Sequence, residues 1–381
     1  MQFLRFEPER RYNNKAMNET GRHHPRLDSA VSLLRDLIAE PSPSREEAGT
    51  ADIWEKWLNC RGLSNVGRFH NNVYCVHPDF REDRQTLMLN SHHDTVKPVK
   101  SYTRDPYSAT IEGDRLYGLG SNDAGGSGVA LASAFVELCE LHELPVNLIF
   151  AITAAEEVMG EYGMRAFLPH LREKGLYPDM AIIGEPTNLE PAVAERGLIV
   201  LDCVTRGVSG HAGRGEGINA LYRAIEDIEI IRNFEAPETS GILGKIRTNI
   251  TMIEAGTQHN VVPDECRFVA DIRTTDTYSN EETARMLQSA VKWSELTPRS
   301  TRVRASVISE SHPLVESAKS LGKTPFVSQT TSDMALMPDI ATLKIGPGDS
   351  KRSHSADEYI LISEINEALY FYPELIKNIN I

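Results

Sequence analysis

VNLIFAITAAEEVMG, residues 146–160, joins an apolar run to two adjacent glutamates, and this join decides how the chain folds. Runs that are apolar at every position are typical of strands covered on both faces, as in a sheet between layers of helices. Glu156 and Glu157 follow the run, and adjacent like charges need either solvent or a cation. The stretch therefore predicts a buried strand that ends at a candidate cation site.

The composition is that of a soluble globular protein, with 40% hydrophobic and 25% charged residues. At 381 residues the chain is long enough for two domains, or for one domain with a large insertion. The net charge of -14 would repel nucleic acids and anionic membranes, so neither is an expected partner. No apolar run approaches the roughly 20 residues of a membrane span.

The ends and the cysteines indicate a cytoplasmic protein. Residues 1–25 are expected to form a polar tail without the apolar core of a secretory signal, and Met17 is an alternative start. The five cysteines are odd in number and include no CxxC pair. This pattern fits reduced thiols in the cytoplasm rather than a disulfide framework or a thiolate zinc site.

The order of apolar runs predicts an α/β domain interrupted by a smaller domain. Residues 198–309 read as strand, helix, strand, strand, helix and strand, with the last strand expected within residues 301–309. That order is the split βαβ pattern of a ferredoxin-like domain. We therefore expect a first catalytic part in residues 1–197, an inserted α+β domain in residues 198–309, and a second catalytic part in residues 310–381.

Potential metal ligands follow four of the expected strands. These are the groups His92-His93-Asp94, Glu156-Glu157, Glu185 and, within a loop, His354. Ligand sites of open α/β sheets lie at the carboxyl ends of strands, so these side chains can converge, with Asp123 added from the loop GLGSNDAGGSG. Nitrogen and oxygen ligands without thiolate suit zinc, cobalt or manganese. Three ligating carboxylates and one hydroxide would balance two divalent ions, whereas a single ion would leave buried charge uncompensated.

Each motif also has an ordinary interpretation when it is taken alone. A histidine after a strand is more often a surface or capping group, and a pair of glutamates is usually the polar start of a helix. The loop GLGSNDAGGSG could bind a nucleotide phosphate, but it lacks GxGxxG and its aspartate would repel a phosphate. Only the joint placement at strand ends favours a metal centre.

An ordered set of motifs resembles the M20 metallopeptidases, most closely their acetylornithine deacetylase branch. The motifs are SHHDTV, GLGSNDAGG, TAAEEVMGEYG, IIGEPT, GVSGHAG, NVVP, VADIRT, TTSD and GPGDSKRSHSADEY. They span most of the chain in the order of that family. The resemblance implies a mixed central sheet between helices, with an inserted ferredoxin-like α+β domain that acts as a lid and in dimerisation.

The resemblance also implies two metal ions per chain, zinc with cobalt or manganese as alternatives. His92, Asp123 and Glu185 would bind one ion. Asp123, Glu157 and His354 would bind the other, so Asp123 would bridge the two.

Further roles come from the same resemblance. Glu156 would be the general base beside the bridging water and would pass the proton to the leaving amine. Asp94 would accept the second N–H of His92, whereas His93 would face away as a structural residue. The peptide between Asn122 and Asp123 would be cis.

Within the inserted domain, the resemblance implies substrate contacts. His211 would reach the active site of the partner subunit in a homodimer and donate to the oxyanion. Arg273 would bind a substrate carboxylate, although a strand-edge surface charge is the alternative interpretation. Asn260, Thr331 and Ser332 are weaker candidates for carbonyl or carboxylate contacts.

The expected function is hydrolysis of an N-acyl amino acid, acetyl or succinyl, of the ornithine or citrulline type in arginine biosynthesis. A di- or tripeptidase or a succinyl-diaminopimelate desuccinylase would use the same chemistry on another substrate. A metal-binding pseudoenzyme is the alternative of another class, and it would be expected to lack Glu156 or a ligand. None of these residues is missing.

Overall fold

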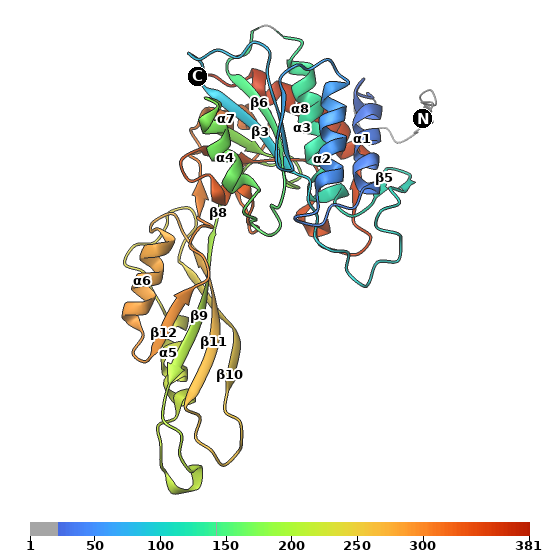
Figure 1. The fold of residues 1–381 in the computed structure, drawn as a ribbon. Helices are drawn as coiled ribbons and strands as arrows, with labels where there is room; N and C mark the ends of the chain where they lie inside the picture. Colours follow the sequence, from blue (N-terminus) through green and yellow to red (C-terminus); the bar gives the residue numbers. More distant parts are fainter. Residues whose placement is uncertain (1–21, 142) are drawn as a thin grey trace. The chain divides into compact units, whose positions relative to one another are not determined.

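The computed structural model describes residues 22–141 and 143–381, which form two compact units. The first unit contains the described residues up to Glu190 together with Glu316–Lys323 and Lys344–Ile381. The second contains Pro191–Val315 and Thr324–Leu343, and the segment predicted as an insertion falls within it (Figure 1). Met17 and most of the predicted polar tail lie outside the described residues.

The first unit is built on a sheet in which strands follow the order β1-β2-β6-β3-β7. Their bounds are β1 (Val66–Phe69), β2 (Asn72–Val76), β6 (Asn147–Thr153), β3 (Thr86–His92) and β7 (Met180–Ile183). Neighbours pair antiparallel from β1 to β6 and parallel from β6 to β7. Every residue of β3 and β6 is buried, as their apolar runs predict.

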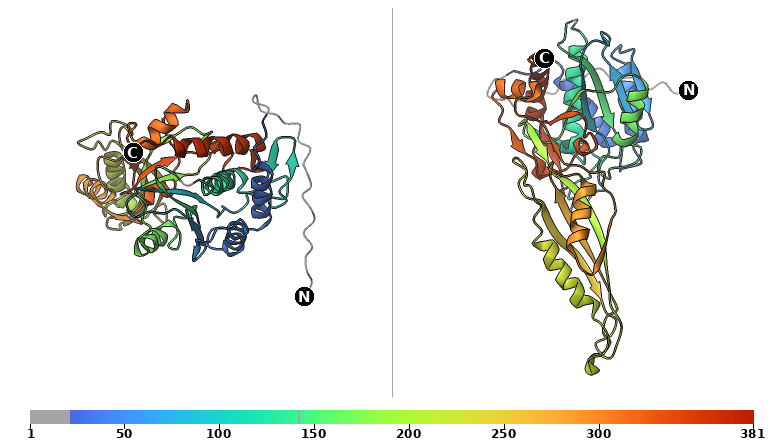
Figure 2. Two further views of the ribbon diagram at one scale, coloured as in Figure 1. Left: turned by 90° about the horizontal axis from the view of Figure 1, so that it is seen from above. Right: turned by 90° about the vertical axis from the view of Figure 1, so that its left-hand side faces the viewer.

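Helices cover both faces of this sheet. They are α1 (Leu27–Ala39), α2 (Ala48–Asn59), α3 (Gly126–Leu138), α4 (Met164–Glu173) and α8 (Ile362–Lys377), with α8 beside α3 (Figures 1 and 2). On one face, the ring of Phe150 in β6 lies 5.7 Å from Trp54 of α2 and 6.0 Å from Phe135 of α3. On the other face, Tyr74 of β2 lies 5.6 Å from Phe167 of α4. Among the described residues, no helix has the length and apolar character that crossing a membrane requires.

A small sheet in the first unit aligns two loops that carry predicted ligands. Its strands are β4 (Ile111–Glu112), β5 (Arg115–Tyr117) and β16 (Tyr359–Leu361), in the order β16-β5-β4. Tyr359 pairs with Tyr117, so the end of the loop before β16 lies beside the start of the loop after β5. The first of these loops contains η4 (Ser350–Arg352) and His354, and the second contains η1 (Ser121–Gly125) and Asp123.

The second unit contains a four-stranded antiparallel sheet with the order β10-β11-β9-β12. The elements are β9 (Gly197–Arg206), α5 (Ala220–Arg232), β10 (Arg247–Ala255), β11 (Glu265–Thr274), α6 (Asn280–Ala290) and β12 (Ser294–Pro298). Alternate residues of β9 and β11 are buried, and Leu201 and Phe268 pack in one cluster with Ile231 of α5 and Leu287 of α6. Period-two burial is typical of a sheet with helices on one face only.

Shorter elements complete the chain. They are β8 (Ala192–Glu195), η2 (Ala212–Arg214), β13 (Ser306–Val307), α7 (Pro313–Ser320), β14 (Phe326–Val327), η3 (Asp333–Leu336) and β15 (Ala341–Lys344). Within the second unit, β13 pairs antiparallel and β14 parallel with β8.

The prediction for the last strand of the split βαβ pattern is wrong. That strand is Ser294–Pro298, which pairs with β9. Residues 301–309 contribute the short strand Ser306–Val307, which pairs with β8, and a single bridge from Val303 to Leu198 of β9. The segment SELTP does alternate, with Ser294 and Leu296 buried and Glu295 and Thr297 exposed. Such a short run directly after a helix gives too weak a period-two signal to separate it from the helix end.

Candidate metal centre

The parallel strands β6, β3 and β7 end at the same edge of the first unit. His92 is the last residue of β3, which lies between the other two strands. Glu156 and Glu157 follow β6 within a few residues, and Glu185 follows β7. Because strand β3 pairs in parallel with both neighbours, the carboxyl ends of the three strands lie together.

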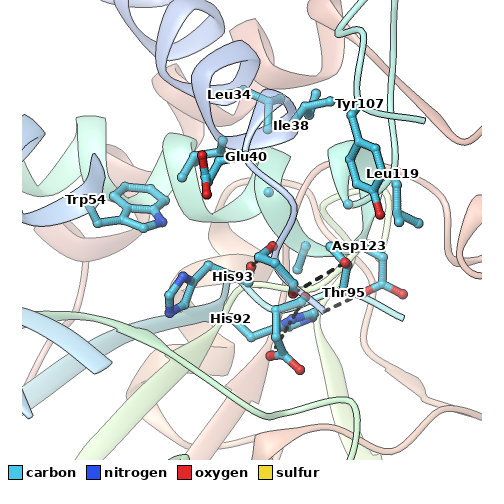
Figure 3. Close-up of a pocket in the computed structure, with 16 residues that line it drawn as sticks. Leu34, Ile38, Glu40, Trp54, His92, His93, Thr95, Tyr107, Leu119 and Asp123 are labelled. Atoms are coloured by element: carbon cyan, nitrogen blue, oxygen red, sulfur yellow. Dashed lines mark hydrogen bonds and ion pairs between the residues drawn. The ribbon is translucent and has the colours of Figure 1, made fainter. Parts of the chain in front are cut away.

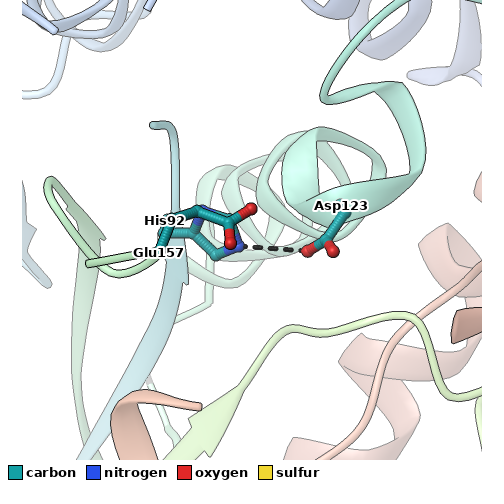
Figure 4. A group of neighbouring side chains, drawn as sticks. All are labelled: His92, Asp123 and Glu157. Carbon is teal, nitrogen blue, oxygen red and sulfur yellow. Dashed lines mark hydrogen bonds and ion pairs between the residues drawn. The ribbon is translucent and has the colours of Figure 1, made fainter. Parts of the chain in front are cut away.

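The predicted ligands converge at this edge. His92 Nε2 lies 3.3 Å from Asp123 Oδ1, 3.7 Å from Glu185 Oε1 and 4.0 Å from Glu156 Oε2. Ligand atoms of His92, Asp123 and Glu157 all lie within 4.8 Å of one another (Figure 4). The ends of three strands and one loop, which lie far apart in the sequence, therefore supply the side chains of one cluster.

Asp123 lies between the two imidazoles. Its Oδ1 faces His92, whereas its Oδ2 lies 3.5 Å from Nε2 of His354. His354 Nε2 also lies 3.0 Å from Glu157 Oε2. One oxygen of Asp123 toward each histidine is the arrangement that a bridging carboxylate requires.

Negative charge is crowded in the cluster, and the pKa values show it. Burial raises the pKa of Glu185 to about 8, with the charges of Asp123 and Glu157 adding to the rise. Burial and the charge of Asp123 likewise raise the pKa of Glu358 to about 8. The hydrogen bond to Glu157 is the main cause that raises the pKa of His354 to about 9. Protons compensate the charge here, and a divalent cation would compensate it by replacing them.

The pKa of the fully buried His92 is raised as well. Burial by itself lowers its pKa, but hydrogen bonds to Asp123 and Asp94 and the charges of Glu156 and Glu185 raise the pKa well above its ordinary value. Imidazole nitrogens and carboxylate oxygens without a thiolate form a donor set that fits zinc, cobalt or manganese.

A profile of Peptidase family M20/M25/M40 matches residues 88–378, which is most of the chain and includes every residue of the cluster. The chain belongs to this family. It is therefore an enzyme of a metallo-hydrolase family, and the resemblance inferred from the motifs is confirmed.

Relatives in the M20 family have several substrates in their names. Acetylornithine deacetylase of Edwardsiella ictaluri is 28% identical over 362 residues, covering 88% of this chain and 93% of the relative. Succinyl-diaminopimelate desuccinylase 2 of Ruegeria sp. is 29% identical over 275 residues, covering 67% and 68%. A peptidase M20 domain-containing protein of Schizosaccharomyces pombe is 27% identical over 366 residues, covering 92% and 85%.

Solved structures confirm the predicted fold class. Aminopeptidase PepT from Bacillus cereus has a TM-score of 0.75 at 18% identity, covering 93% of this chain and 98% of that chain. The Bacillus subtilis YXEP protein, described as a dinuclear metal binding peptidase from M20 family, has a TM-score of 0.70 at 17% identity, covering 92% and 97%.

Asp94 holds the backbone of both glutamates in this M20 centre. Its Oδ1 accepts from the N–H of Glu156 at 2.9 Å, and its Oδ2 accepts from the N–H of Glu157 at 3.2 Å and from Ser44 Oγ at 2.7 Å. His92 Nδ1 lies 3.0 Å from the backbone oxygen of Asp94 and 3.5 Å from its carboxylate. The predicted contact to His92 is thus made mainly by the Asp94 carbonyl, because the carboxylate is engaged by three other donors.

His93 faces away from the cluster. Its Nδ1 lies 2.8 Å from Thr50 Oγ1 and its Nε2 lies 2.9 Å from the backbone oxygen of Asn71. Burial lowers its pKa to about 4, so it is neutral in the folded protein at pH 7. This is the structural role that the sequence predicts.

The cis peptide bond lies between Asp123 and Ala124, one position later than predicted. The N–H groups of Asn122 and Asp123 both donate to Oε1 of Glu358, at 2.8 and 2.9 Å, across the bond that was expected to be cis. That shared acceptor fixes the orientation of the two N–H groups, which the sequence alone does not reveal.

Glu47 is a buried residue beside the centre that the sequence did not reveal. It is 1% exposed, and its Oε1 accepts from the N–H of Ala155 at 3.1 Å, while its Oε2 accepts from Asn71 Nδ2 at 2.9 Å. Ala155 is 5% exposed and has φ of 57°, so its buried N–H lies outside regular structure and is paired by Glu47. Glu47 precedes a helix in the motif SREEAG, where an acid is ordinarily an exposed residue of the helix start.

A small cavity with apolar and polar lining lies beside the cluster. A cavity of about 20 Å³ lies beside it, lined by Leu34, Ile38 and Trp54 as well as by His92 and Asp123 (Figure 3). That volume holds about one water molecule. Polar residues, among them Ser42, Asp94 and Thr95, line the rest of this cavity.

The predicted substrate residues lie in the second unit. His211 is exposed at the start of η2, and the N–H of the next residue donates to the backbone oxygen of Asn260 at 3.1 Å. Ser332 is buried, and its N–H and Oγ donate to the Glu195 carboxylate at 3.1 and 2.9 Å, with Thr331 half-buried beside it. The structure thus brings His211 close to Asn260, and it gives the Ser332 side chain an internal partner.

Arg273 forms a two-point contact within its own strand. Its Nε and Nη2 donate to the Asp271 carboxylate at 2.8 and 3.1 Å, and 39% of its side chain is exposed. A substrate carboxylate would have to share this guanidinium with Asp271 or replace Asp271 on it.

Proposed function

We propose that this M20 enzyme removes an acetyl or succinyl group from the nitrogen of an amino acid of the ornithine or citrulline type, in arginine biosynthesis. The observation that carries the reaction class is the position of Glu156. Its carboxylate lies 4.0 Å from His92 within the ligand cluster, and its backbone is fixed by Asp94. A carboxylate held beside ligands without itself being needed as one is suited to proton transfer.

Two divalent ions, zinc or alternatively cobalt or manganese, would complete the site. His92, Asp123 and Glu185 would hold one ion, and Asp123, Glu157 and His354 the other. When bound, such ions polarise the acyl carbonyl and lower the pKa of water toward neutrality. Glu156 takes the proton of the attacking water on its carboxylate and delivers it to the leaving amine nitrogen.

The substrate is proposed to carry a free α-carboxylate. Arg273 lines a surface hollow of about 640 Å³ on the second unit, together with Arg232, Arg247 and Asp271. Three guanidinium groups against one carboxylate make this hollow locally positive in a chain with a net charge of -14. Both the acetylornithine deacetylase and the desuccinylase names among the relatives support an acyl amino acid.

We also propose a homodimer that forms through the second unit, with His211 donating to the oxyanion in the partner's site. Strand β10 forms one edge of the four-stranded sheet, and no described strand pairs with its outer side. Met252 and Ile253 on this strand are 64% and 53% exposed. An edge strand with exposed apolar side chains is suited to pairing with a second copy.

A panel of substrates tests the proposal. N-acetyl and N-succinyl derivatives of ornithine and citrulline, succinyl-diaminopimelate and unblocked tripeptides are incubated with enzyme supplied with Zn²⁺ or Co²⁺. An acylated ornithine or citrulline is expected to have the highest kcat/KM. Faster turnover of tripeptides or of succinyl-diaminopimelate would replace the proposed substrate by that class. Unchanged activity after complete metal removal would refute the mechanism itself.

A further inference from the structure

We propose that Glu358 is a positioning residue for Asp123 and that, through Asp123, it sets the affinity of the centre for both metal ions. The inference rests on the proposed two-metal site. It assigns to this glutamate a role that neither the motifs nor the ligand cluster require. Glu358 is 2% exposed and belongs to the loop that ends at β16.

The carboxylate of Glu358 accepts three backbone N–H groups of the loop that carries Asp123. Oε1 accepts from Asn122 at 2.8 Å and from Asp123 at 2.9 Å, and Oε2 accepts from Gly120 at 3.2 Å. Both oxygens are thereby occupied by the backbone. Glu358 therefore acts on the position of the loop rather than as a further ligand.

The loop needs this outside acceptor because its backbone is irregular. Gly120 has φ of 75°, and Asp123 has φ of -119° and ψ of 96°, which are not helical values. Buried N–H groups in such a segment have no regular partner within their own element. Leaving them unpaired would cost free energy, and a buried carboxylate that accepts several of them removes that cost.

The same short segment supplies a ligand. His354 lies four residues before Glu358, and its Nε2 lies 3.5 Å from Asp123 Oδ2. The side chain of Asn122 also joins the two loops, because its Nδ2 donates to the backbone oxygen of Asp349 at 3.1 Å and to Ser353 Oγ at 3.3 Å. The segment before β16 thus places one ligand directly and orients a second through its backbone.

Asp123 is the residue on which such an effect would be largest. Its two oxygens face different histidines at 3.3 and 3.5 Å, so a small rotation of its backbone moves both oxygens away from their ions. Loss of a residue that orients a ligand typically lowers metal affinity by about 10–100-fold. Since Asp123 is shared, we expect both ions to be affected rather than one.

The test compares Glu358→Ala and Glu358→Gln with Asp357→Ala. Asp357 is the adjacent residue, and its carboxylate accepts from the N–H and Oγ1 of Thr103 at 2.9 and 2.5 Å and from the N–H of Arg104 at 3.0 Å. It therefore matches Glu358 in number of hydrogen bonds but holds a different loop. Zn²⁺ affinity is measured by competition with a chromophoric chelator, and the ligand geometry by the visible spectrum of the Co²⁺ form.

We expect Glu358→Ala to bind both ions about 10–100-fold more weakly and to change the Co²⁺ spectrum. Glu358→Gln keeps one oxygen for Asn122 and Asp123 but turns an amide group toward the N–H of Gly120, so we expect a loss of about tenfold. Asp357→Ala should bind the ions as the wild type does, with the same spectrum.

Wild-type affinity and an unchanged spectrum in Glu358→Ala would overturn the inference. If that variant does not fold, Glu358→Gln decides, and unchanged affinity in it would overturn the inference equally. An equal loss in Asp357→Ala would also overturn it, because the effect would then belong to the segment as a whole. A wild-type protein that binds no ion would refute the proposed function instead.

Discussion

Replacing Asp94 tests how the general base is held in place. The Asp94 carboxylate accepts the N–H groups of Glu156 and Glu157, at 2.9 and 3.2 Å, and the hydroxyl of Ser44 at 2.7 Å. It is fully buried, so water cannot replace it without rearrangement. Asp94→Ala removes these acceptors but leaves the backbone oxygen that lies 3.0 Å from His92 Nδ1.

The structure sets the size of the effect. A hydrogen bond to a charged group contributes about 1.5–3 kcal/mol, so losing the bonds from Glu156 and Glu157 removes about 3–6 kcal/mol from the turn that carries them. The part of the loss in kcat that acts through Glu156 is limited by the contribution of a general base, which is about 10²–10⁴-fold. We expect kcat of Asp94→Ala to fall by about 100-fold, with KM unchanged within about threefold.

The assay measures kcat, KM and metal content on the same preparation, with the preferred substrate of the panel. Asp94→Asn keeps one acceptor oxygen and should lose about tenfold in kcat. Ser44→Ala is the matched control, because it removes a partner of Asp94 but leaves both backbone contacts, and its kcat should stay within about threefold of wild type. A kcat for Asp94→Ala within threefold of wild type at full metal content would refute the reasoning. So would a loss of activity that only parallels a loss of metal.

Four further outcomes are expected. Glu156→Ala should retain its metal ions and lose about 10²–10⁴-fold in kcat, and a tenth of wild-type kcat would mean that another group is the base. Arg273→Ala should lower kcat/KM about 10–150-fold for acyl amino acids but much less for their α-amides, and an equal loss on both would remove Arg273 as the carboxylate anchor. Heterodimers of His211→Ala with Glu156→Ala should regain part of the activity, whereas failure after demonstrated subunit exchange would place His211 outside the partner's site. Alkylation at pH 8 should modify exposed Cys60 rapidly and Cys75, half-buried Cys139 and Cys203 slowly, since burial raises the pKa of these three thiols to about 12; rapid modification of all the thiols in the native protein would contradict this.

The residues that converge on the candidate centre were predictable because strand ends are visible in the sequence. His92 closes β3, Glu156 and Glu157 follow β6, and Glu185 follows β7, and each of these strands is an apolar run. Parallel neighbours bring such exits together without any detail of side-chain packing. His354 follows β15 only after a loop, and its placement beside Glu157 needed the motif as well as the strand.

The residues that hold the backbone of the centre were not predictable in the same way. Glu47 and Glu358 contact N–H groups more than one hundred residues away in the chain. A backbone N–H has no residue type, so no pattern of letters announces its need for a partner. Both glutamates lie next to regular elements, where an acid is ordinarily exposed to solvent.

Apart from Glu156, the carboxylates at and around the centre therefore fall into two groups with different partners. Asp123, Glu157 and Glu185 face the two histidines, and burial, together with the charges of Asp123 and Glu157, raises the pKa of Glu185 to about 8. The other group, which consists of Glu47, Asp94 and Glu358, accepts N–H groups from the turns that carry the first. The first group needs cations, whereas the second is stabilised by the backbone. Removal of the metal should therefore not displace the second group or the loops that it holds. We expect metal removal to abolish activity while changing the fold of the first unit little.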